Sequence, residues 1–329
     1  MAAAQAQAQA QAQANSSFSM KLPTLQIYID SSSLSEFKVC PRKYYYSIVL
    51  GRQPMAESVH LTFGTLLHKA LELYHQARFN KDSVADHPTA LKSVVKWLMT
   101  ATWDREHNRP WSSGDKYKNR FTLIRTVVWY LDQHQEDVLV TAVLKDGRPA
   151  IELPFTIDSG YTAFTGEEFI LCGKIDRIAV FKPDSNYYVT DVKTTQSTIG
   201  EYYFKKFTPD NQVSTYSLAG ALAFGIPVNG LIIDACQVAV EFSRFDRGLI
   251  ERSQAQLEEW QVDLGYWLMN LNHCAETENW PRNDSACDRY GGCPFRPVCS
   301  QRNPNAAQQV LMGSYAERTW DPLKNRLTF

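Results

Sequence analysis

Hydrophobic and polar positions along the chain change period several times, and the changes outline a mixed α/β protein. Residues 61–79 carry apolar side chains at helical spacing, and mostly helical segments follow to about residue 135. Runs rich in β-branched and aromatic residues predict strands at about 137–181 and 187–195. A further helix, strand and long helix are expected at about 209–225, 230–240 and 252–276. This order predicts a central mixed sheet flanked by helices.

The same pattern suggests how the chain is divided. The first 22 residues are dominated by an Ala/Gln alternation, which predicts a disordered low-complexity tail. We expect one domain over residues 23–303, with a helical insertion at about 80–135, and a C-terminal tail at 304–329. A short helix is expected to begin at Ser33, whose spacing to Glu36 is that of a capping box.

Two neighbouring predicted strands carry charged residues at positions that the pattern makes buried. The run at 169–180 is apolar on both faces, as in a central strand, yet contains Asp176. In the next strand, the period of two puts Asp191 and Lys193 on the same face. An ionised Asp inside an apolar strand is costly unless it is paired or binds a metal. Two such residues and a Lys converging on one place indicate a divalent cation and phosphodiester chemistry.

Ordinary ion pairs are the alternative explanation. Asp176 could pair with Arg177 or Lys174, and Asp191 with Lys193, near a sheet edge. An Asp-x-Lys sequence alone is weak evidence for a site. Other features of the chain are therefore needed to decide.

The helix at 61–79 supplies one such feature. Gly64, His68 and Glu72 follow one line along it, at intervals of four residues. A glycine inside a helix costs about 1 kcal/mol relative to alanine, so Gly64 predicts a close approach to that face. His68 is either a hydrogen-bonded core histidine or a metal ligand that completes the carboxylate site.

The helix expected from Pro209 to Gly225 supplies another. Pro209 suits its first turn. Gln212 and Tyr216 are four residues apart and share a face with Gly220. They could bind a phosphate or a base at the mouth of a metal site, or belong to a half-buried helix surface.

The cysteines form the strongest independent signal. Cys287, Cys293 and Cys299 are separated by two equal gaps of five residues in a turn-rich segment, and Cys40 is the best candidate for a fourth ligand. Four thiolates bind zinc or an iron–sulfur cluster. Structural zinc sites usually have closer pairs, so the spacing favours a cluster, with Zn²⁺ as the alternative. The remaining cysteines are expected to be buried thiols: Cys172, Cys236 and Cys274.

Composition limits the classes of function. The 329 residues have a formal net charge of −1, which excludes a global basic field, so nucleic acid could bind only through local patches. No apolar run approaches the length of a membrane span, and we expect no membrane partner. Seven cysteines without a secretory signal indicate a reducing, cytoplasmic setting, the host cytoplasm if the protein is viral. The candidate patches, which could equally be solvated faces, are Lys38, Arg42, Lys43 and Arg52 with Tyr44–Tyr46, and Lys205-Lys206.

Together these motifs resemble the RecB-type branch of the PD-(D/E)XK nucleases. That branch includes exonucleases with iron–sulfur clusters, such as the AddB nuclease domain and the CRISPR-adaptation nucleases. The motifs come in the order of the family and span about residues 40–299. They are the glycine–histidine helix (Gly64, His68), G-x-(I/V)-D (Gly173–Asp176), D/E-x-K (Asp191–Lys193), Q-x-x-x-Y (Gln212–Tyr216) and the four cysteines.

The resemblance implies a restriction-endonuclease-like core and a metal-dependent DNA exonuclease. His68, Asp176, Asp191 and the carbonyl of Val192 would bind Mg²⁺ or Mn²⁺. Lys193 would orient the attacking water or stabilise charge on the phosphoryl oxygens. Gln212 and Tyr216 would position the DNA strand. Cys40, Cys287, Cys293 and Cys299 would hold a structural cluster, expected to be 4Fe-4S.

The expected partner is DNA that is single-stranded or has a free end, in recombination, repair or phage DNA processing. No G-x-x-x-x-G-K-[ST] phosphate loop is present, so unwinding would require a helicase or recombination partner. The alternative is a non-catalytic, metal-stapled DNA-binding subunit of a recombination complex. The complete set of acidic, lysine and histidine residues argues against that alternative.

Overall fold

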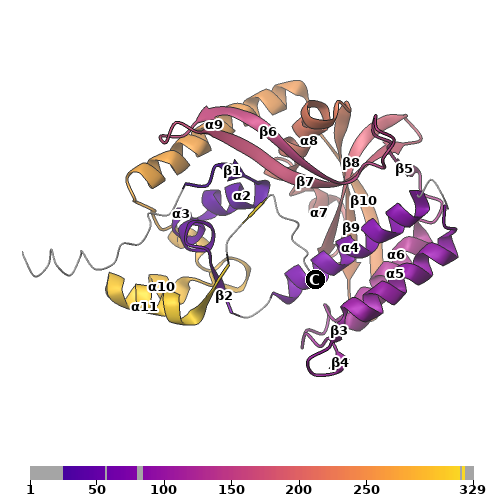
Figure 1. Cartoon of the computed structure of the whole chain (residues 1–329), viewed down its shortest axis with the longest axis horizontal. Coiled ribbons are helices and arrows are strands. Elements are labelled where there is room, and N and C mark those ends of the chain that lie inside the picture. Colours follow the sequence, from indigo (N-terminus) through magenta and orange to yellow (C-terminus); the bar gives the residue numbers. More distant parts are fainter. Residues whose placement is uncertain (1–24, 56–57, 80–83, 319–320, 323–329) are drawn as a thin grey trace, which may run out of the picture.

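A computed structural model describes residues 25–55, 58–79, 84–318 and 321–322. The low-complexity tail expected at residues 1–22 lies outside the described residues. One mixed sheet of seven strands crosses the described part of the chain (Figure 1). Its strands are β1 (Tyr28–Ile29), β5 (Leu139–Thr141), β6 (Ile151–Thr162), β7 (Glu168–Phe181), β8 (Asn186–Thr195), β9 (Val228–Val238) and β10 (Ser243–Glu251).

Strand β7 is the centre of this sheet. On one side it pairs antiparallel with β6 and, further along, with β5. On the other side its second half pairs antiparallel with β8 from Arg177 to Phe181, and its first half pairs parallel with β1 at Ile170 and Leu171. Strands β7 and β8 therefore separate just before Arg177, and the sheet forks there.

Helices cover both faces of the sheet, as the α/β order predicts. Helix α8 (Asn211–Phe224) and the short α7 (Glu201–Lys205) contribute to a core with β6, β7, β8 and β9. On the other face, a core joins β8 and β9 to α4 (Val59–Phe79), α5 (His87–Ala101) and α6 (Arg120–Gln133). The central strands are thus buried on both sides, which explains their nearly continuous apolar sequence.

Residues 80–135 are largely helical in their described part, as expected, with one interruption. Between α5 and α6 the chain makes a small hairpin of β3 (Trp103–Asp104) and β4 (Arg109–Pro110). This hairpin projects at the lower edge of the molecule in Figure 1.

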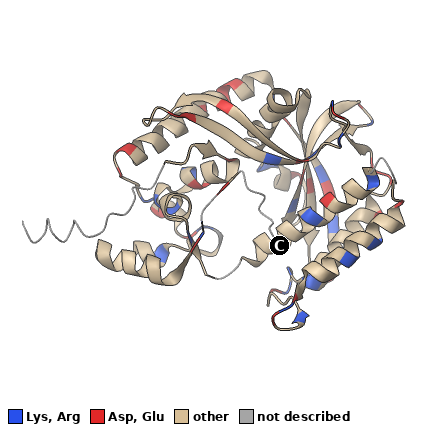
Figure 2. Ribbon diagram, in the orientation of Figure 1, with Lys and Arg blue, Asp and Glu red and all other residues tan. Residues whose placement is uncertain are grey.

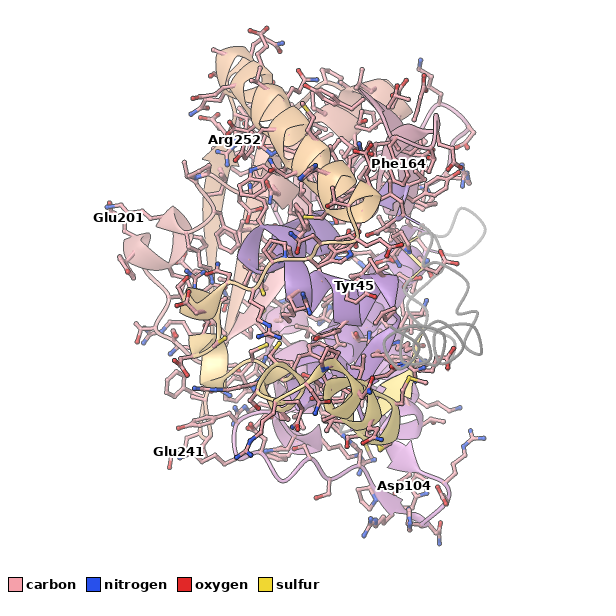
Figure 3. The ribbon with its side chains drawn as sticks, turned by 90° about the vertical axis from the view of Figure 1, so that its left-hand side faces the viewer. Tyr45, Asp104, Phe164, Glu201, Glu241 and Arg252 are labelled. Carbon is pink, nitrogen blue, oxygen red and sulfur yellow. The ribbon has the colours of Figure 1, made fainter. Side chains whose placement is uncertain are left out.

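The two ends of the described chain pack together. A π-helical turn (Tyr45–Val49), which follows α2 (Ser31–Val39) and α3 (Pro41–Tyr44), packs against the C-terminal helices α10 (Arg296–Cys299) and α11 (Pro304–Ser314). Strand β2 (Arg52–Pro54) pairs with β11 (Tyr315–Glu317). Residues 304–317, part of the segment expected to be a tail, therefore form a helix and a strand. Figure 3 shows Tyr45 between the long helix α9 (Gln254–Glu276) and these C-terminal helices.

Three details differ from the sequence analysis. Strand β10 was not predicted, because residues 243–248 (SRFDRG) are mostly polar, as suits a strand at the sheet edge. The capping box of α2 joins Asp30 and Ser33, not Ser33 and Glu36. Helix α8 begins after Pro209, because the Asp210 side chain caps its first turn. None of the described helices is long and apolar enough to cross a membrane.

Candidate active site

The three candidate metal ligands meet at the fork of the sheet. The ladder between β7 and β8 ends at the pair Arg177–Thr190, so the neighbouring residues Asp176 and Asp191 lie just where the strands part. Helix α4 crosses this point and brings His68 to the carboxylates. One ligand atom each of His68, Asp176 and Asp191 lies within 4.8 Å of the other two.

Charges of opposite sign compensate one another in this group. His68 Nδ1 lies 2.8 Å from Asp176 Oδ2, and Lys193 Nζ lies 2.6 Å from Asp191 Oδ2. Asp191 is only 2% exposed. Both Oδ2 atoms are buried, and apart from these ion pairs no described donor forms a hydrogen bond with them. Buried carboxylate oxygens and an imidazole are a suitable donor set for a divalent cation.

The pKa values reflect this concentration of charge. Burial disfavours charge on His68, but the adjacent Asp176 carboxylate outweighs it and raises the pKa of His68 to about 9. Burial raises the pKa of Asp191 to about 6, against the opposing effect of Lys193 and with the help of the Asp176 charge. Without a metal, His68 and Asp191 therefore hold protons more tightly than free side chains would. The pKa of Asp176 is lowered, because His68 outweighs the effect of burial.

A chain of hydrogen bonds holds Lys193 from the other side. Lys193 Nζ donates to Gln212 Oε1 at 2.7 Å, and Gln212 Nε2 donates to Tyr216 Oη at 3.1 Å. Tyr216 Oη donates to the carbonyl of Lys174 on β7 at 2.8 Å. Gln212 and Tyr216 therefore connect Lys193 to the strand that carries Asp176.

The two glycines of the motifs have different surroundings. A Cβ on Gly173 would lie 2.9 Å from the Phe155 ring and 3.5 Å from Tyr216, so this glycine lets the two rings pack on β7. No described atom lies within 4 Å of the corresponding position on Gly64. The close approach predicted at Gly64 is therefore not made by the described protein, because that face of α4 is open.

The pairing alternatives for Asp176 are not realised. Lys174 forms an ion pair with Glu152 of β6. Arg177 is 5% exposed and donates from Nε to Thr190 Oγ1 at 3.1 Å, across the last rung of the fork. Asp191 does pair with Lys193, but within the group that also contains His68 and Asp176.

The sequence analysis missed a further acidic residue beside this group, Glu152. Glu152 lies opposite Asp176 across the β6–β7 ladder and has φ 52°, a backbone conformation unusual outside glycine. Burial raises its pKa. Glu152 and Glu72 line a cavity of about 20 Å³ together with His68 and Asp176, which is room for about one water molecule. No local sequence signal identifies Glu152, because its importance depends on strand register.

Comparison with known proteins identifies the family. The sequence matches the PD-(D/E)XK nuclease superfamily over residues 31–300. The chain belongs to this superfamily. The superfamily prediction is thus confirmed, and with it a nuclease with a restriction-endonuclease-like core. Such nucleases typically use Mg²⁺ or Mn²⁺.

Two further comparisons add less. A search of curated proteins finds no match to the nuclease. Among solved structures, the nuclease is similar to the crystal structure of a proposed exonuclease from Eubacterium rectale, with 11% identity and a TM-score of 0.45. This similarity covers 80% of the nuclease chain and 86% of the other.

The nuclease brings its four candidate cluster cysteines together in one region, residues 40–50 with residues 280–315, which we call the cysteine lobe. Cys40 links α2 to α3 and accepts a hydrogen bond from Asn283 N at 3.5 Å, four residues before Cys287. Cys293 N donates to the carbonyl of Cys287 at 2.8 Å. Cys299 lies with Cys293 at the edge of the core around Phe295. Burial raises the pKa of Cys299, and the neighbouring thiols add to this effect.

The sulfur atoms do not form a zinc-sized cage. Tetrahedral Zn–S bonds of about 2.3 Å would place the sulfurs about 3.8 Å apart. Among the described residues, no three cysteines bring their sulfurs within 4.8 Å of one another. The three other cysteines are buried, as predicted: Cys172, Cys236 and Cys274.

The first candidate basic patch serves packing. Its residues contact this same lobe or neighbouring helices. Lys38 donates to Asn211, and Arg42 donates to the carbonyl of Trp280. Lys43 forms an ion pair with Glu36, and Arg52 forms one with Glu317. In the second patch, Lys205 pairs with Glu201, and Lys206 lies 3.6 Å from the centre of the Tyr203 ring. These contacts favour the structural interpretation of both patches.

Proposed function

We propose that this nuclease hydrolyses phosphodiester bonds in DNA, from an end, with Mg²⁺ or Mn²⁺. His68, Asp176, Asp191 and the carbonyl of Val192 would hold the ion. The observation that carries the proposal is that ligand atoms of the three side chains approach one another within 4.8 Å at a fork of the sheet. Action from an end rests on the resemblance of the ordered motifs to RecB-type exonucleases.

The residues around the ion have distinct roles in this proposal. When bound, the metal supplies a water of lowered pKa and neutralises charge on the scissile phosphate. Lys193 donates a hydrogen bond to that water or to a phosphoryl oxygen, because its ammonium lies beside Asp191. Gln212 and Tyr216 keep the ammonium in place through their hydrogen bonds. This positioning role is supported more directly than a contact of Gln212 or Tyr216 with the DNA strand.

The test compares cleavage of labelled DNA by the parent, Asp191→Ala and Lys193→Ala with Mg²⁺ or Mn²⁺. Asp246→Ala and Lys182→Ala are matched controls, because both residues are exposed. We expect cleavage by the parent and the controls but not by the two site variants. Undiminished cleavage by both site variants would refute the assignment. Binding of DNA by the parent without any cleavage would favour the non-catalytic subunit.

The proposal includes an iron–sulfur cluster held by Cys40, Cys287, Cys293 and Cys299. Two observations support it: the four residues share one lobe, and among the described residues no three sulfurs lie within 4.8 Å of one another. A cluster of several iron atoms spans a wider set of thiolates than one zinc ion does. The cluster would be structural, joining Cys40 to a segment nearly 250 residues later in the chain.

Anaerobic purification followed by iron, sulfide and absorbance measurements tests the cluster. We expect iron and acid-labile sulfide with a visible chromophore, lost in Cys293→Ser but retained in Cys172→Ser, a buried cysteine outside the lobe. Zinc in place of iron, or no metal at all, would contradict the proposal.

The biological role is proposed as recombination, repair or phage DNA processing, in a cytoplasmic setting and with a helicase or recombination partner for duplex DNA. It rests on the resemblance and on the lack of a phosphate loop in the sequence. Digestion of 5′- and 3′-labelled single- and double-stranded oligonucleotides tests it. Rapid degradation of blunt duplex without a partner would contradict the need for unwinding.

A further inference from the structure

Helix α6 displays a line of aromatic and arginine side chains. Phe121, Arg125 and Trp129 follow one another at intervals of four residues, so they lie on one face of the helix. Phe121 is 72% exposed and Trp129 is 44% exposed. The Arg125 guanidinium lies 5.9 Å from the centre of the Phe121 ring and 5.4 Å from that of Trp129, so it sits between the two rings.

The turn between β9 and β10 extends this surface. Arg125 donates to the carbonyls of Ala239, Val240 and Phe242, which fixes the turn against α6. Phe242 is 44% exposed, and the Arg244 guanidinium lies 6.0 Å from its ring centre. We call Phe121, Arg125, Trp129, Phe242 and Arg244 the aromatic–arginine surface.

Large aromatic side chains exposed together require an explanation. Burying such rings is favourable, so a protein rarely leaves several on one face unless something covers them. The arginines lie over these rings but do not bury them, because Phe121, Trp129 and Phe242 stay exposed. A flat, π-bonded partner that also carries negative charge would satisfy both residue types.

The charge of this part of the chain favours a polyanion. Residues 87–129 contain eight Lys and Arg against three Asp and Glu, a formal charge of +5 in a chain whose total is −1. Figure 2 shows this excess as blue segments along α5, α6 and the adjoining hairpin. The acidic residue closest in sequence to the surface is the exposed Glu241 in the turn, labelled in Figure 3.

The surface also adjoins the catalytic strand. Lys118 is buried immediately before α6, and its Nζ donates to Thr194 Oγ1 at 2.9 Å. Thr194 follows Lys193 on β8. Phe121 lies three residues after Lys118, in the first turn of α6, so the aromatic–arginine surface starts close to the candidate active site and leads away from it along α6.

We propose that the aromatic–arginine surface binds single-stranded nucleic acid by stacking bases on Phe121, Trp129 and Phe242, with Arg125 and Arg244 beside the phosphates. This proposal rests on the proposed function for the choice of substrate. From Phe121 to Trp129 the helix rises about 12 Å, which matches about three stacked nucleotides. Stacking on aromatic side chains is tolerant of sequence, so binding is expected for any base composition.

The experiment measures binding of fluorescein-labelled oligothymidylate by fluorescence anisotropy in EDTA, so that no cleavage occurs. Trp129→Ala and Phe121→Ala are compared with the parent and with Tyr266→Ala, an aromatic control that is 62% exposed on the distant helix α9. We expect each surface variant to raise Kd about ten-fold, the double variant to raise it further, and Tyr266→Ala to leave it unchanged. Trp129→Phe should restore most of the affinity, because it keeps a stacking ring.

Two readouts separate this proposal from its alternatives. Hydrolysis of bis(4-nitrophenyl) phosphate with Mn²⁺, a substrate too small to reach α6, should be equal in the parent and the surface variants, which shows that they are folded. Unchanged oligonucleotide affinity in the double variant overturns the proposal. If that variant instead loses association with a protein, the surface is a protein-binding site and the proposal is equally overturned. If the parent binds through Trp129 but cleaves nothing, the proposed function fails and this inference stands.

Discussion

The fork of the sheet and the cysteine lobe both collect candidate ligands from distant parts of the sequence, but they hold them differently. At the fork, His68, Asp176 and Asp191 are already within 4.8 Å of one another. In the lobe, four cysteines share one neighbourhood without reaching zinc-ligating distances. The first set is imposed by strands and a helix, and the second is carried by turns and short helices.

This difference has an energetic side. The fork confines two carboxylates, one of them almost fully buried, and the sheet must supply the stability that their proximity removes. The lobe has no buried carboxylate among its described residues. It is held by aromatic packing, such as Trp280 stacked on Tyr44 and Tyr45, and by Arg42 N donating to the Pro281 carbonyl. We therefore expect replacement of a ligating side chain to relieve strain at the fork but to destabilise the lobe.

The largest effect should come from Asp191→Asn at the fork. It removes a metal ligand while keeping the shape of the side chain, so cleavage should fall by at least about a thousand-fold, or about 4 kcal/mol in activation free energy. Single-turnover cleavage of labelled DNA measures it. A loss below ten-fold would mean that the fork does not hold the catalytic ion.

The lobe should respond next most strongly. Cys293→Ser should remove one cluster ligand and lower the free energy of unfolding by about 3 kcal/mol, because metal binding and folding are coupled. Urea unfolding under anaerobic conditions measures this effect, with Cys172→Ser as the control. Equal stability of parent and Cys293→Ser would show that aromatic packing alone holds the lobe.

The fork should respond in the opposite direction when no metal is present. The pKa of Asp191 is raised to about 6 in the folded protein, so the folded state prefers the protonated acid. The free energy of unfolding should therefore fall as the pH rises from the ordinary pKa of Asp to about 6. The Asp191→Asn variant should not show this decrease, because its side chain does not ionise. In EDTA above pH 6, Asp191→Asn is expected to unfold at a higher temperature than the parent, by an amount equivalent to about 3 kcal/mol.

Thermal unfolding followed on both sides of pH 6 measures that difference. At a pH below the ordinary Asp value the two proteins should converge, because both side chains are then neutral. A variant that is less stable than the parent at every pH would contradict the view that the fork is strained.

The smallest effect is expected at Tyr216. Tyr216→Phe removes the hydroxyl that joins Gln212 to the Lys174 carbonyl and should cost about 1 kcal/mol of stability. If the tyrosine positions Lys193, kcat should fall several-fold while KM for DNA stays the same. A rise in KM alone would instead favour direct contact with the DNA strand.

Much of the fold follows from local sequence. The apolar period predicted helix α4 within two residues of its start. Strand β7 was predicted to be buried on both faces, as it is, because helices cover both faces of the sheet. Asp191 and Lys193 could be paired in advance, since the period of two alone puts them on one side of β8.

The rest depends on non-local pairing. The position of the fork follows from where β1 replaces β8 beside β7, which no local pattern encodes. Glu152 became visible only through its register opposite Asp176. The buried network of Asp234 with Tyr130 and Arg247, at 2.6 and 2.8 Å, was also missed, because its members are far apart in the sequence.

The fork also determines which changes in chain length the protein can tolerate. Asp176 is fixed by the rungs from Arg177 to Phe181, so deleting one residue there would turn its carboxylate toward the opposite side of the sheet. The turn at 182–185 and the connection between β6 and β7 lie outside those rungs and could lengthen without moving it. Insertions and deletions among natural homologues should therefore spare the rungs and accumulate in these two turns.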